Sequence, residues 1–79
     1  MATIPDKPMN AREVLDAYFL ETRAKLIEIA ANLDRVERAS QFLDVREDTR
    51  LRFIQEALAI LQSGQPNRAE LIQKLYSKE

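Results

Sequence analysis

Residues 15–36 have the sequence LDAYFLETRAKLIEIAANLDRV, and this stretch decides the fold. From Leu15 onward, one series of positions advances by alternating steps of four and three residues: Leu15, Phe19, Thr22, Leu26, Ile29, Leu33, Val36, Ser40 and Leu43. Alternating steps of four and three residues average about 3.5 residues, close to one helical turn. The side chains of the series therefore lie along one face of an α-helix, as in a heptad repeat. We call this face the seam. The pattern predicts a long amphipathic helix that buries its seam against other helices.

The start of this helix is marked by Asn10 and Glu13, which have the spacing of a capping box. In a capping box each of the two side chains accepts a hydrogen bond from the backbone N–H of the other residue. The first helix is therefore expected over about residues 11–40. The seam pattern fails after Leu43, and Asp44 with Glu47 has a second capping signature. A connection is expected near residues 41–44, although a continuous helix through this segment stays open because it contains no glycine.

Two further helices are expected after this connection. The second spans about residues 45–63 and ends before Gly64 and Pro66, residues that favour a left-handed cap and a break in the helix, respectively. Asn67 and Glu70 then form a third capping signature, which predicts a short helix over about residues 68–76.

These patterns predict an all-α protein with a flexible tail over residues 1–9 and a single helical domain over residues 10–79. We expect the long first helix to pack antiparallel to the second, with the short third helix beside them. A chain of 79 residues without cysteine has little core and no disulfide to stabilise it. Dimerisation that completes a helical bundle is the remaining source of stability, so we expect a homodimer.

Several chemistries are excluded or disfavoured by composition. The sequence has no His, no Cys and one Gly, so it offers no histidine base, no thiolate metal site and no glycine-rich phosphate loop. No cofactor is expected. No apolar run approaches the length of a membrane span or of a signal peptide, which favours a cytoplasmic protein that does not contact membranes.

Two clusters of charge are candidate functional sites. Carboxylates three residues apart on facing helices can hold Mg²⁺ or Mn²⁺; this chain has three such pairs, Glu13/Asp16, Asp34/Glu37 and Asp44/Glu47. They flank the seam or mark helix starts, so caps and solvated charges explain them better. Five arginines within residues 34–52 suggest nucleic acid, but five acidic residues in the same window balance them, which disfavours nucleic-acid binding.

Charges of alternating sign lie along one border of the seam. At 100° per residue, four side chains project within about 40° of one another: Arg12, Asp16, Arg23 and Asp34. Border positions of this kind set pairing and register in helical bundles through charge complementarity. We call these four residues the charged border and take them as the candidate interaction site.

The sequence therefore favours a small non-enzymatic helical module that associates with itself and, as a further option, with another protein. The alternative is a metal-dependent hydrolase or nucleotide-binding helical bundle that uses the paired carboxylates. The two differ in metal binding, which the first does not require.

Overall fold

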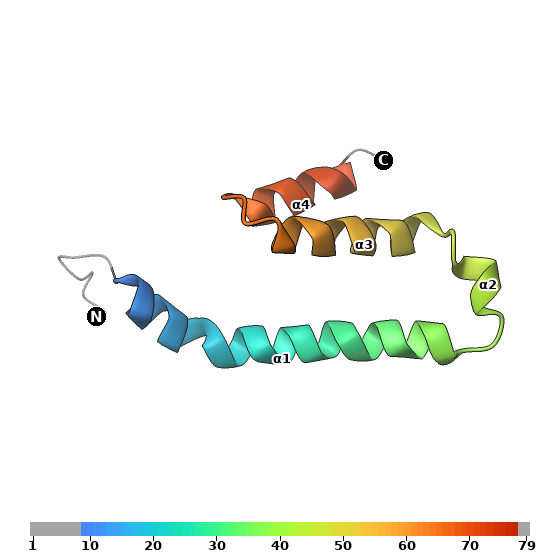
Figure 1. Ribbon diagram of the computed structural model, residues 1–79, viewed down its shortest axis with the longest axis horizontal. Helices are drawn as coiled ribbons and strands as arrows, with labels where there is room; N and C mark the ends of the chain where they lie inside the picture. The colour runs from blue at the N-terminus through green and yellow to red at the C-terminus, as the bar shows by residue number, and fades with distance from the viewer. Residues whose placement is uncertain (1–8, 78–79) are drawn as a thin grey trace, which may run out of the picture. The chain divides into compact units, whose positions relative to one another are not determined.

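The computed structural model describes residues 9–77. Four helices account for most of this range: α1 (Ala11–Arg38), α2 (Phe42–Val45), α3 (Thr49–Gln62) and α4 (Arg68–Ser77). The described residues contain no strand, which confirms the all-α prediction (Figure 1). Except for Met9, the tail expected over residues 1–9 lies outside the described residues.

Helix α1 begins at the capping box that the sequence predicts. The N–H of Asn10 donates to Oε1 of Glu13 at 3.0 Å, and the N–H of Glu13 donates to Oδ1 of Asn10 at 2.9 Å. Arg35 and Arg38 lie in the last turn, where cations interact favourably with the helix dipole. The 28 residues of α1 correspond to a length of about 42 Å at 1.5 Å per residue.

A turn follows α1, as expected, but the connection contains a helix that the sequence does not predict. Gln41 adopts a left-handed conformation with φ of 65°, and the single-turn helix α2 begins at the next residue. The predicted cap at Asp44 is wrong, because Asp44 lies inside α2. Asp48 instead caps α3: its extended backbone lets Oδ1 accept from the N–H of Arg50 at 2.8 Å.

Helices α3 and α4 form an antiparallel hairpin (Figure 1). Gly64 takes the predicted left-handed conformation after α3, with φ of 75°. Leu71, Ile72 and Leu75 of α4 are half-buried, and the rings of Phe53 and Tyr76 pack with their centroids 5.7 Å apart. Because α4 lies beside α3, the two helices do not extend one another end to end.

The capping box predicted at Asn67 and Glu70 is wrong for the described chain. Asn67 has φ of 61°, whereas an N-cap side chain reaches the helix amides from an extended backbone. Its carbonyl oxygen accepts the N–H of Leu71 at 3.1 Å, and Glu70 pairs with Lys74 at 3.7 Å.

The chain divides after Arg38 into two units. The first contains α1 and the second contains α2, α3 and α4. The expected single domain and the antiparallel packing of the first two long helices stay predictions.

Candidate protein-interaction surface

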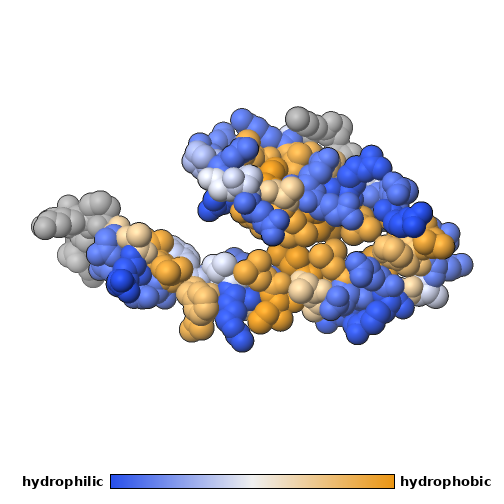
Figure 2. Space-filling view, viewed as in Figure 1, coloured by the Kyte–Doolittle hydropathy of each residue, from blue (hydrophilic) through white to orange (hydrophobic). Residues whose placement is uncertain are grey.

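The seam of α1 carries large apolar side chains that the structure leaves exposed. Leu15 is 63% exposed and Leu26 is 53% exposed, although both belong to the most regular apolar pattern in the sequence. Twelve large apolar residues are exposed among residues 9–77, and eight of them lie on α1. No residue in this range is fully buried. Figure 2 shows apolar side chains at the surface of both units. The seam is therefore a surface with the composition of a helix interface.

All four residues of the charged border lie on α1 and are exposed. Within residues 9–77 none of them takes part in an ion pair, whereas five pairs form elsewhere in that range. The structure thus leaves Arg12, Asp16, Arg23 and Asp34 available to groups on another helix. Their function as an interaction site stays a prediction.

Glu21 and Lys25, four residues apart on α1, form an exposed ion pair. Nζ of Lys25 donates to Oε2 of Glu21 at 2.6 Å, and both side chains are mostly exposed. This hydrogen bond, together with the negative charge of Glu21, raises the pKa of the Lys25 ammonium. An exposed pair of this kind contributes little to stability.

Helix α1 has a second apolar face, which the pattern of the seam does not reveal. Leu20, Ala24, Ile27 and Ala31 follow steps of four, three and four residues, and Ala17 continues the series toward the N-terminus. At 100° per residue this set lies roughly half a turn away from the seam. We call it the second face. In the sequence this face is a second heptad series, which is hard to see because alanine is only weakly hydrophobic. The charged border lies between the two faces.

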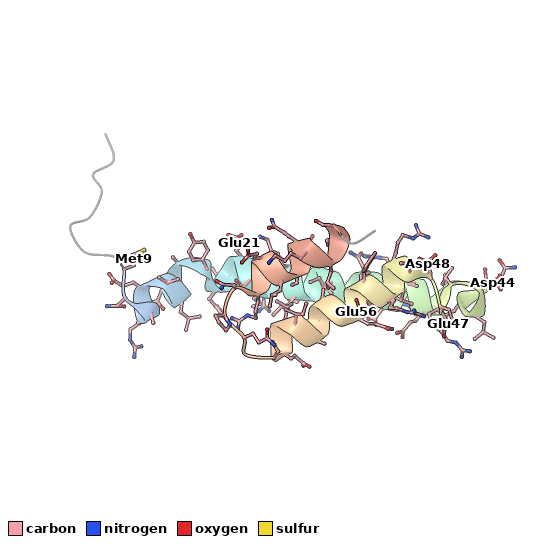
Figure 3. The ribbon with its side chains drawn as sticks, turned by 90° about the horizontal axis from the view of Figure 1, so that it is seen from above. Met9, Glu21, Asp44, Glu47, Asp48 and Glu56 are labelled. Carbon is pink, nitrogen blue, oxygen red and sulfur yellow. The ribbon has the colours of Figure 1, made fainter. Side chains whose placement is uncertain are left out.

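Two acidic residues near the α2–α3 junction, Glu47 and Asp48, are engaged with arginines. Asp48 accepts from Nε and Nη2 of Arg50, each at 3.0 Å, and Glu47 accepts from Nη2 of Arg52 at 3.2 Å. The hydrogen bonds from the side chain and backbone of Arg50 lower the pKa of Asp48 from its usual 3.8 to about 2. Figure 3 shows Asp44, Glu47 and Asp48 around this junction. Among the described residues, no three acidic side chains gather closely enough to hold a metal ion.

Within residues 9–77, no helix is both long enough and apolar enough to cross a bilayer. No family model, no curated protein and no solved structure matches this chain. Its function is therefore inferred from the geometry and chemistry of its own side chains.

Proposed function

We propose that this chain is a non-enzymatic helical protein-interaction module that self-associates, with a second copy completing a helical bundle. The observation that carries the proposal is the concentration of exposed large apolar side chains on α1, in a chain whose described residues include none that is fully buried. Monomeric proteins rarely leave a continuous apolar surface of this kind uncovered. Covering it with another helix removes apolar area from water and stabilises the assembly.

The lengths of the helices support the need for a second chain. We propose that α3 packs antiparallel to the seam of α1, as the sequence pattern favours. The 14 residues of α3 span about 21 Å, half the length of α1. Helix α4 adds no reach, because it folds back beside α3. About half of the seam therefore requires a helix from another molecule.

The charged border supports the same proposal. Asp16 and Arg23 are seven residues apart, too far to pair along one helix. Arg23 has no acidic residue three or four positions away on α1, so its opposite charge is available only on another element or another chain. Association with a different protein through this border is the second form of the same function.

We place the module in the cytoplasm on the sequence evidence, and cell fractionation tests this placement.

Light scattering coupled to size-exclusion chromatography tests self-association directly. At micromolar concentration the measured mass should be about twice the chain mass of 9.1 kDa. A mass of one chain that persists as the concentration rises would reject the proposal.

The alternative function, a metal-dependent hydrolase or nucleotide-binding bundle, requires a bound divalent ion. Thermal melts with excess Mg²⁺ or Mn²⁺ should match melts in chelator. A site filled at about 100 times its dissociation constant would add about 2.7 kcal/mol to the free energy of unfolding. A rise of the melting temperature by that amount would favour the alternative over the interaction module.

A further inference from the structure

The second face of α1 has both the exposure and the composition of a contact surface. Leu20 is 74% exposed and Ile27 is 52% exposed. The remaining positions, Ala17, Ala24 and Ala31, are alanines seven residues apart. The face therefore alternates large and small side chains along the helix. An alanine at every second contact position lets another helix approach closely, provided that its large side chains fall opposite the alanines.

We propose that the second face binds the same face of a second copy, with the two α1 helices antiparallel about a two-fold axis near residues 25 and 26. This inference rests on the proposed self-association and adds to it a contact through the second face, separate from the seam. In this register Leu20 lies opposite Ala31 of the other copy, and Ala24 lies opposite Ile27. Each layer then holds one large and one small side chain, which fills the contact evenly. A parallel pair would instead place leucine against leucine and alanine against alanine.

Charge at the ends of the second face favours the same orientation. Glu13 and Arg38 continue the heptad series toward the two ends of α1, and the antiparallel register brings Glu13 of each copy opposite Arg38 of the other. A parallel register would bring Glu13, Asp34 and Arg38 each against its own copy, and like charges across an interface are strongly unfavourable. The antiparallel register does bring Glu21 near Glu28, and Asp16 near Glu37, of the other copy. Lys25, whose Nζ lies 2.6 Å from Oε2 of Glu21, offsets the first of these repulsions.

Disulfide trapping tests the register, because the chain contains no cysteine of its own. Ala17→Cys and Asp34→Cys are exposed positions that face each other across the proposed contact. A disulfide should form when the two variants are mixed and should be absent when either is oxidised alone. In two copies of one variant the cysteines would lie about 25 Å apart at 1.5 Å per residue. A disulfide needs Cα atoms within about 7 Å.

Two controls make the result specific. Mass spectrometry distinguishes the mixed disulfide from a disulfide between identical chains, since the two variants differ in mass. Asn32→Cys, mixed with Ala17→Cys, reports random collision because residue 32 projects about 100° away from the centre of the second face. Circular dichroism of each variant should match the unmodified protein.

Each outcome decides between alternatives. A mixed disulfide from Ala17→Cys and Asp34→Cys, absent with Asn32→Cys, supports the antiparallel contact. A disulfide formed by Ala17→Cys alone shows a parallel pair and overturns the inference. A dimer in light scattering without any specific disulfide also overturns it but leaves the proposed function intact. A monomer in light scattering rejects both.

Discussion

Leu26 and Ile27 are a matched pair for separating the two faces of α1. They are adjacent in sequence, similar in size and almost equally exposed, at 53% and 52%, yet they belong to the seam and to the second face, respectively. We expect Ile27→Ala to weaken dimerisation while changing the stability of the individual chain little. Leu26→Ala should instead lower the stability of the chain, because we expect the seam to pack in part against α3.

The size of the effect follows from the exposed fraction of Ile27. Complete burial of an isoleucine side chain stabilises by about 2 kcal/mol. Since 52% of Ile27 is still exposed, association can add about half of this, or about 1 kcal/mol. A two-fold contact contains the residue twice, so Ile27→Ala should cost about 2 kcal/mol, which is a rise of about 30-fold in Kd.

Sedimentation equilibrium over a range of concentrations gives the Kd, and thermal melts below that Kd report the stability of the chain. An equal effect of the two variants on Kd would show that the faces do not have separate roles. A Kd for Ile27→Ala equal to that of the unmodified protein would refute burial of the second face between copies.

Three further predictions address the border, the hairpin and the α3 cap. Arg23→Glu should weaken association while helicity stays near that of the unmodified protein, because a partner charge opposite Arg23 would then be repelled; unchanged association in light scattering would show a merely solvated border. Gly64→Ala should lower stability by about 1 kcal/mol in thermal melts, since its φ of 75° is unfavourable with a side chain even though the added Cβ would meet nothing within 4 Å; Gly64→Asn, which tolerates this conformation better, should lose less. The Asp48 carboxylate stabilises the fold above its usual pKa of 3.8, and this contribution should disappear as the pH falls from 3.8 toward 2. Asp48→Asn keeps a capping oxygen, so its stability should vary less with pH over that interval.

The elements that the sequence predicts well are those set by local chemistry. The Asn10–Glu13 capping box and the left-handed Gly64 involve residues a few positions apart, and both are confirmed. The C-terminal end of the first helix is predicted to within two residues, because the seam pattern continues along the whole helix.

Prediction fails where two local signals compete. Asp44 and Asp48 can both cap a helix, and the acidic residue three positions after Asp44 favours the wrong one. Asp48 caps because it lies directly before the apolar series of α3 and binds Arg50 through both backbone and side chain. Asn67 tolerates the left-handed region as well as a cap geometry, and here it adopts the former.

The candidate site was predicted only in part. The charged border was found because alternating charge is visible in sequence, and the structure leaves all four of its residues without an ion pair within residues 9–77. The second face was missed because three of its five positions are alanines, whose role depends on how closely another helix approaches. That distance is a property of an assembly and is not encoded in the hydropathy of one chain.

The left-handed Gln41 has a consequence for topology. A residue with a side chain is less stable in this region than in a helix by about 1 kcal/mol, and glycine would avoid the penalty. Gln41 in the right-handed region would allow the helix to continue through α2 to Val45. Gln41→Gly would remove the penalty and stabilise the turn between α1 and α2.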